Sequence, residues 1–263
     1  MQHRYKYHRT KRHLSLLEQA AAASDSVRPG IWYDLALAQG HAGRWDDAAI
    51  TLQDLVVSRP DILTGQVLLG EALWALGDRV HAALVLNAVL QTDSLLAQAY
   101  MRLGDIQADQ RRADSAVVLW RRGVAAGGGP SVSSGLHLRL GRHERSRGNE
   151  EAATDHLGAA LAWADEALNQ SAADPALWAL MGASYLALDS IDTALEHLKA
   201  ARYLADAPVD ESQVHLLTGA CYDRMGRRAD AVREYEQVLA MPAPYMDQVA
   251  ARRYINRPYR FEE

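Results

Sequence analysis

Residues 178–201 read WALMGASYLALDSIDTALEHLKAA, and this stretch decides the fold. Four of its apolar or small residues stand at i, i+3, i+4 and i+7, on one face of an α-helix. They are Trp178, Met181, Gly182 and Tyr185. After a polar turn at 189–192, Ala194, Leu198 and Ala201 form a second helical stripe. Neither helix can bury its stripe alone, so we expect a helix pair that another pair covers.

The same skeleton recurs along the chain in two series of small residues. The first helices carry Ala36, Gly70, Gly104, Gly141, Gly182 and Gly219. The second helices carry Ala48, Ala82, Ala116, Ala153, Ala194 and Ala231. Both series advance by 34, 34, 37, 41 and 37 residues. This is the helix–turn–helix period of the tetratricopeptide repeat, and the chain resembles that family over about residues 29–245.

The resemblance implies an all-α fold: a right-handed α–α superhelical solenoid of about six tetratricopeptide repeats, with helices capping both ends. The expected organisation has six repeats between terminal segments. These are a basic tail at 1–13, an N-terminal capping helix at 14–28, repeats at about 29–62, 63–96, 97–130, 131–174, 175–211 and 212–245, and a C-terminal capping helix and tail at 246–263.

Two local departures from the repeat carry further expectations. Seven extra residues after the fourth repeat equal about two helical turns, so we expect a longer second helix from Glu150 to about Asn169. The turn at 110–112 reads Gln-Arg-Arg where other units mostly have glycine. We therefore expect that corner to be strained or shaped differently.

Charge and cysteine content limit the class of protein. Residues 1–13 hold five Lys or Arg and no acid, whereas residues 14–263 carry a formal charge of −10. Cys221 is the only cysteine, which excludes an intramolecular disulfide and a multi-cysteine metal site. Neither a secretion signal nor a membrane-length apolar run is visible. The expectation is a cytoplasmic protein, or a periplasmic one if a signal segment was removed.

In tetratricopeptide arrays one strip of each first helix lines a concave groove, and the resemblance carries that strip onto this chain. The expected partner-binding residues are Tyr33, Leu37, Glu71, Trp74, Met101, Asp105, Asp109, Arg142, Arg145, Asp223 and Arg224. The acids at 71, 105 and 109 would favour a basic partner segment, and the arginines at 142 and 145 an acidic one. A merely solvated face is the alternative for any single charge, as packing is for Trp74.

One subclass of the family grips an acidic C-terminal peptide with Lys, Asn and Arg. The corresponding positions in the first three repeats hold Tyr33/Leu37, Val67/Glu71 and Met101/Asp105, which disfavours that chaperone-tail function. No catalytic or phosphate-binding motif appears, and the repeats use up nearly all of the chain. We therefore expect no catalytic residue, no metal, no cofactor and no small-molecule substrate.

The main hypothesis is a non-enzymatic adaptor or scaffold, a subunit of a larger assembly, that binds a protein segment in the groove. The alternative assigns function to the basic tail. Its contacts would be Arg4, Lys6, Arg9, Lys11 and Arg12 with nucleic acid or an anionic membrane surface. A solvated tail without function is the remaining interpretation of these charges.

Overall fold

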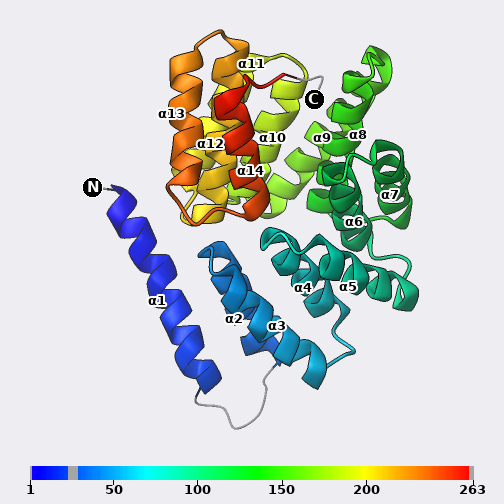
Figure 1. Ribbon diagram of the computed structural model, residues 1–263, viewed down its shortest axis with the longest axis vertical. Coiled ribbons are helices and arrows are strands. Elements are labelled where there is room, and N and C mark those ends of the chain that lie inside the picture. Colours follow the sequence, from blue (N-terminus) through cyan, green and yellow to red (C-terminus); the bar gives the residue numbers. More distant parts are fainter. Residues whose placement is uncertain (1, 23–28, 261–263) are drawn as a thin grey trace.

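The computed structural model describes residues 2–22 and 29–260, with side chains described from Arg12 onward (Figure 1). The described part contains fourteen α-helices and no strand. They are α1 (Gln2–Ala22), α2 (Pro29–His41), α3 (Trp45–Ser58), α4 (Leu63–Ala75), α5 (Arg79–Thr92), α6 (Ala97–Asp109), α7 (Ala113–Ala126), α8 (Pro130–Ser146), α9 (Glu150–Gln170), α10 (Pro175–Ala187), α11 (Ile191–Leu204), α12 (Pro208–Arg224), α13 (Arg228–Leu239) and α14 (Tyr245–Asn256). The expected all-α superhelical solenoid is confirmed.

The helices pack as six consecutive pairs, from α2/α3 to α12/α13, and each pair also contacts the next. A small residue of the first helix faces a bulky side chain that follows it by 16 residues. A Cβ added at Gly182 would lie 2.8 Å from Leu198 Cγ, and one at Gly219 would lie 2.4 Å from Tyr235 Cε1. The same relation holds for Gly70 with Leu86, Gly104 with Trp120, and Gly141 with Leu157. The small residues therefore allow the two helices of a pair to approach closely.

The turns between paired helices, here called corners, share one backbone conformation. Four of them place a glycine at positive φ: Gly43, Gly77, Gly148 and Gly226. The other two place Arg111 at φ 60° and Asp189 at φ 62°. The corner at 110–112 therefore has the ordinary shape, and its strain arises because a residue with a Cβ occupies a left-handed position.

Two helices differ in extent from the sequence-based boundaries. The α1 helix runs from Gln2 through the segment expected to be a tail, which contains no Pro or Gly to interrupt it. The α12 helix begins at Pro208, ahead of the expected start near residue 212. Proline at the first helical position and the acids Asp210 and Glu211 in the first turn favour that earlier start. The α9 helix has 21 residues, Glu150–Gln170, which confirms the expected longer second helix of repeat four, and α8 has 17 residues.

The last helix connects the two ends of the solenoid. In Figure 1, α14 lies over α12 and reaches down to α4, while α12 also contacts α2. The corner glycines make room for this approach. A Cβ at Gly43 would lie 2.3 Å from the Pro242 carbonyl oxygen, and one at Gly77 would lie 3.0 Å from the Tyr245 ring. Arg79 Nη2 also lies 3.2 Å from Met246 Sδ. Residues 242–246 therefore close the array against its first two repeats.

Candidate functional site: the concave strip and its C-terminal segment

The side chains that the sequence assigns to the groove are called the concave strip here. Two of them, Glu71 and Asp105, form an alternating row of charges with Arg102 and Arg139 across repeats two to four. Arg102 forms an ion pair with Glu71, and its Nη1 lies 3.6 Å from Asp105 Oδ2. Arg139 binds the same Asp105 in a two-point manner, with distances of 2.5 and 2.7 Å. Burial would lower the pKa of Arg102, but Glu71 and Asp105 outweigh it and raise that pKa. The row therefore ties three repeats together electrostatically.

Trp74 is held between two repeats. Its indole Nε1 donates a 2.8 Å hydrogen bond to Asp109 Oδ2, and Arg102 lies over its ring at 5.9 Å from Cζ to the centroid. Burial raises the pKa of Asp109; the Trp74 hydrogen bond opposes this and the Asp105 charge adds to it. The half-buried indole thus has a packing and hydrogen-bonding role within the chain, which was one of its two expected roles.

The acidic part of the strip differs from expectation. The sequence favoured a basic partner segment beside the acids at 71, 105 and 109. In the structure Arg102 and Arg139 already neutralise Glu71 and Asp105, and Asp109 binds Trp74. This expectation is corrected because both arginines stand one helical turn before the next strip position, where they reach back to the preceding repeat.

The outer members of the predicted site lie apart from this row. Tyr33 and Leu37 are half-buried on α2, and burial, followed by the charges of Glu71 and Asp34, raises the pKa of Tyr33. Met101 is buried between α6 and α8, against Gly135, and does not line an open groove. At the corners, Arg145 pairs with Glu150 at 3.3 Å and Arg224 with Asp189 at 2.6 Å.

Across repeats four to six the strip is occupied by the chain itself. The residues involved, 257–260, follow α14 as non-helical backbone and are called the C-terminal segment here. Asp223, whose side chain is 1% exposed, anchors it: the Tyr259 backbone N–H donates to Asp223 Oδ2 at 2.8 Å. The Tyr235 hydroxyl donates to the same oxygen at 2.9 Å, and Arg228 Nη1 lies 2.9 Å from Oδ1. Asp223 is therefore a structural anchor rather than an open groove charge.

The side chain of Tyr259 fills a pocket in this strip. It is 8% exposed and packs in a cluster with Leu186, Leu198 and Cys221. The ring of Tyr254 meets it edge-on, with 5.3 Å between centroids. A non-helical segment with one aromatic side chain therefore fits between α10 and α12.

Arg142 of α8 lies at the hydroxyl end of this pocket. Its guanidinium lies close to the Tyr259 hydroxyl and interacts with it. Contact with Tyr259 raises the pKa of Arg142, burial opposes the shift, and Tyr254 adds to it. The Arg142 side chain is exposed. Among the described residues, no carboxylate forms an ion pair with it, and Asp105 makes only the smallest of these contributions.

Sequence reasoning missed several residues that organise the strip: Arg102, Arg139, Arg228, Tyr254 and Tyr259. A signal for two of them was present, since Arg102 and Arg139 hold the same position in consecutive repeats. No comparable signal existed for Tyr254 and Tyr259, because they lie beyond the last repeat and reach the strip only after the chain turns back.

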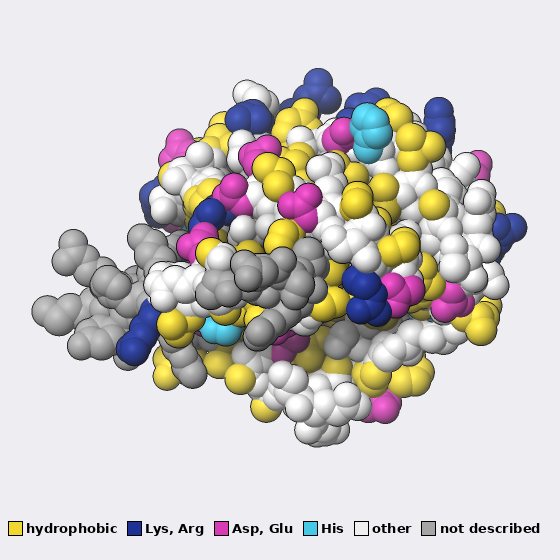
Figure 2. Space-filling view, turned by 90° about the horizontal axis from the view of Figure 1, so that it is seen from below, with side chains coloured by type: hydrophobic (Ala, Val, Ile, Leu, Met, Phe, Trp, Pro, Cys, Tyr) yellow, Lys and Arg dark blue, Asp and Glu magenta, His cyan; other side chains and the backbone are white. Residues whose placement is uncertain are grey.

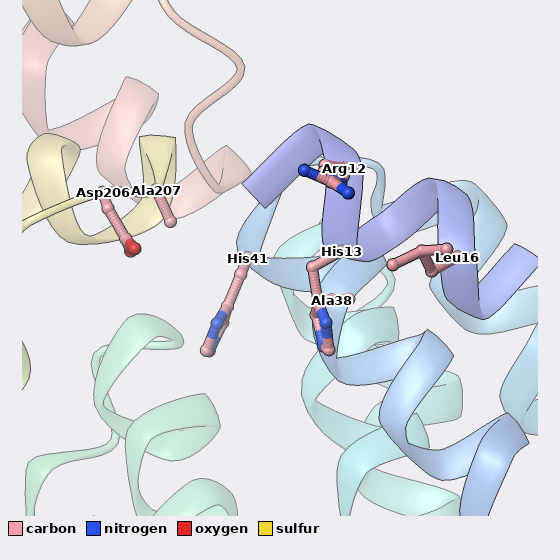
Figure 3. A pocket seen from close by; sticks show the side chains of 7 residues that line it. All are labelled: Arg12, His13, Leu16, Ala38, His41, Asp206 and Ala207. Atoms are coloured by element: carbon pink, nitrogen blue, oxygen red, sulfur yellow. The ribbon is translucent and has the colours of Figure 1, made fainter. Parts of the chain in front are cut away.

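The predicted tail contacts fall on α1. The side chains of Arg4, Lys6, Arg9 and Lys11 lie outside the described residues. Arg12 lines a depression of about 400 Å³ where α1 and α2 face the link between α11 and α12. Figure 3 shows its lining, which combines Arg12, His13 and His41 with Asp206, Leu16, Ala38 and Ala207.

Charges elsewhere are dispersed. On the face seen in Figure 2, acidic and basic side chains alternate with apolar ones and form no broad patch of one sign among the described residues.

Burial raises the pKa of Cys221 to about 12, so its thiol is not a reactive nucleophile. Among the described side chains, those of residues 12–22 and 29–260, no three metal-binding groups cluster. No helix in the described part of the chain has the length and apolar character that spanning a membrane requires.

Comparisons with known proteins agree with the geometry. Residues 31–61 match the family model described as tetratricopeptide repeat. No curated protein sequence matches the chain. A tetratricopeptide repeat protein from Parabacteroides merdae superposes with a TM-score of 0.54 at 13% identity, covering 96% of this chain and 98% of that one. A thermophilic one from Thermus thermophilus gives 0.54 at 23% identity, covering 74% and 97%.

Two larger assemblies share the fold. The hetero-tetramer Cut9–Hcn1 of the APC/C matches with a TM-score of 0.59 at 15% identity, covering 88% of this chain and 43% of that one. The human IFIT1 dimer with m7Gppp-AAAA matches with 0.61 at 13% identity, covering 94% and 58%. This chain therefore spans about half the length of these two relatives.

Proposed function

We propose that this chain, a tetratricopeptide repeat protein, is a non-enzymatic scaffold that holds an extended segment of a partner protein on its concave strip. One observation carries the proposal. The strip of repeats four to six already accommodates non-helical backbone, with Asp223 accepting a backbone hydrogen bond and the Tyr259 ring buried in a cluster. A surface that holds one non-helical segment of its own chain can hold a similar segment of a partner.

The first three repeats serve this function as a rigid support. The charge row from Glu71 to Arg139 is paired internally, so it fixes the curvature of the array and leaves recognition to repeats four to six. The likeness to Cut9–Hcn1, a complex of several chains, supports a role as one subunit of an assembly. A cytoplasmic location is part of the same proposal.

The test compares two variants with the same chemical change. Arg142→Glu reverses a charge in the strip, whereas Arg122→Glu reverses one on the exposed surface of α7. Affinity capture from the native host would use the wild type and both variants. We expect a partner that is retained by the wild type and by Arg122→Glu but lost with Arg142→Glu. Equal retention by all three would contradict a partner site on the strip.

A second candidate function rests on α1. The first thirteen residues of the chain are basic, and Arg12, His13 and His41 line the depression in Figure 3. IFIT1, which shares the fold, is described with a capped RNA. Binding of single-stranded RNA to the full chain would then be lost in residues 14–263 and would weaken steeply with salt. Binding that survives both the truncation and high salt would contradict this alternative.

A further inference from the structure

Arg142 differs from the other arginines of the strip in what it faces. Arg102 and Arg139 face Asp105, Arg228 faces Asp223, and the corner arginines face Glu150 and Asp189. Arg142 instead lies against a hydroxyl group, that of Tyr259. A carboxylate would add Coulomb attraction between opposite charges and could pair with the guanidinium at two points, and a hydroxyl supplies neither. The Tyr259 hydroxyl is therefore a weaker partner for Arg142 than a carboxylate would be.

The site around Tyr259 has three parts in a fixed order. Asp223 accepts the backbone N–H, the cluster of Leu186 and Leu198 receives the ring, and Arg142 stands at the far end of the ring. We call this arrangement the tyrosine seat. It selects for extended backbone, for an apolar side chain, and for an acceptor at the tip of that side chain.

The C-terminal segment fills the seat without an intervening loop. Arg228 Nη2 donates to the carbonyl oxygens of Tyr254 and Ile255 at 2.6 Å each and so fixes the end of α14. Tyr259 follows within five residues, so its local concentration at the seat is set by a very short tether. Short tethers correspond to millimolar effective concentrations, which weakly bound segments need in order to remain seated.

We propose that the tyrosine seat is a recognition site for an extended, acidic segment of a partner protein, and that the C-terminal segment is its tethered competitor. The inference rests on the function proposed above and specifies its partner. The partner places an apolar side chain in the pocket and a carboxylate against Arg142. It displaces Tyr259 because it supplies the charge that the hydroxyl lacks. Binding of the partner and release of the C-terminal segment are then the same event.

The experiment frees the seat and supplies two defined peptides. A chain that ends at Asn256 keeps α14 and loses residues 257–263. The probes are fluorescein-labelled, C-terminally amidated peptides with the sequence of residues 256–263. One has tyrosine at the position of Tyr259, and the other has 4-carboxyphenylalanine there. The two probes share every other charge, including Glu262 and Glu263, so their difference reports the carboxylate alone.

Fluorescence anisotropy should show that the shortened chain binds both peptides, the carboxylate form roughly tenfold more tightly. Arg142→Gln in the shortened chain should abolish that preference and retain binding of the tyrosine peptide. The full-length chain should bind the carboxylate peptide at least tenfold more weakly than the shortened chain does. Tyr259→Ala in the full-length chain should recover most of the affinity for the carboxylate peptide that the shortened chain shows. This variant provides a second test if the shortened chain folds poorly.

Equal affinity for the two peptides, or a preference that survives Arg142→Gln, would overturn the proposal. So would the absence of binding by either peptide to both the shortened chain and Tyr259→Ala. The proposed function is judged separately: capture of a partner that depends on Arg142 but not on Arg122 would uphold a strip-binding scaffold even where the peptides fail.

Discussion

The packing of Gly219 against Tyr235 leads to a substitution whose effect on stability can be worked out in advance. In Gly219→Ala the new Cβ would lie 2.4 Å from Tyr235 Cε1, 2.8 Å from Cζ and 2.9 Å from Cδ1. Real Cβ atoms do not approach other atoms so closely, so the ring must move. It has little freedom, because Tyr235 is fully buried and its hydroxyl is bound to Asp223.

The expected loss of stability combines opposing effects. Overpacking a filled core costs about 1–3 kcal/mol. Replacing glycine by alanine inside a helix stabilises the folded state by roughly 1 kcal/mol, because alanine has the higher helix propensity. If the ring moves far enough to break its bond to the Asp223 carboxylate, about 1.5–3 kcal/mol more is lost. The net destabilisation should be about 0–2 kcal/mol if the hydroxyl keeps its bond to Asp223 and about 1.5–5 kcal/mol if that bond breaks. In the second case the C-terminal segment should also loosen, because Asp223 holds Tyr259.

Gly158→Ala is the matched control. Gly158 lies inside α9, and a Cβ there would meet nothing within 4 Å. Only the propensity gain applies, so this variant should be more stable than wild type by about 0.5–1 kcal/mol. Urea denaturation followed by far-ultraviolet circular dichroism measures both, as shifts of the midpoint in opposite directions. A Gly219→Ala variant as stable as Gly158→Ala would refute the close-packing argument.

Three further predictions concern single residues. Arg111→Gly should stabilise the chain by roughly 1 kcal/mol in the same urea assay, because Arg111 occupies a left-handed conformation at φ 60° that glycine adopts freely; a loss of stability would contradict the strain. Burial raises the pKa of Asp247 to about 6 despite a 2.6 Å hydrogen bond from Ser212, so stability should fall as pH rises from about 4 to above 6. Asp247→Asn should then be more stable than wild type by up to about 3 kcal/mol at pH 7.5 and equal to it near pH 4. Thermal unfolding across this pH range measures the difference. A difference that stays constant with pH would refute the raised pKa of Asp247. Asp105→Ala should lower the free energy of unfolding by about 3 kcal/mol, because it leaves Arg102 and Arg139 partly buried beside one another. Asp61→Ala, which breaks an exposed pair with Arg59, should leave the urea midpoint unchanged. Equal effects of the two substitutions would contradict the stabilising role of the charge row.

The repeat architecture was predictable because its determinants are local and periodic. Gly182 and Leu198 lie 16 residues apart, as do Gly219 and Tyr235, and a helix pair brings such residues together whatever the rest of the chain does. Arg111 and Asp189 could be recognised as corner residues for the same reason, since the repeat assigns every position a place. The predicted strip members Arg142 and Asp223 do lie together, in contact with one tyrosine.

What that strip holds was decided only by the tertiary structure. Tyr259 lies 36 residues after Asp223 and 117 after Arg142, outside the repeats, and no periodic pattern relates these positions. Their contact depends on where α14 ends and how the chain turns at Pro258, which follows from packing against α12 and α13. Likewise the charges of Glu71 and Asp105 were visible in the sequence, but their neutralisation by Arg102 and Arg139 was not. Periodicity specifies which residues share a face, whereas the distances between side chains on that face come from the curvature of the assembled solenoid.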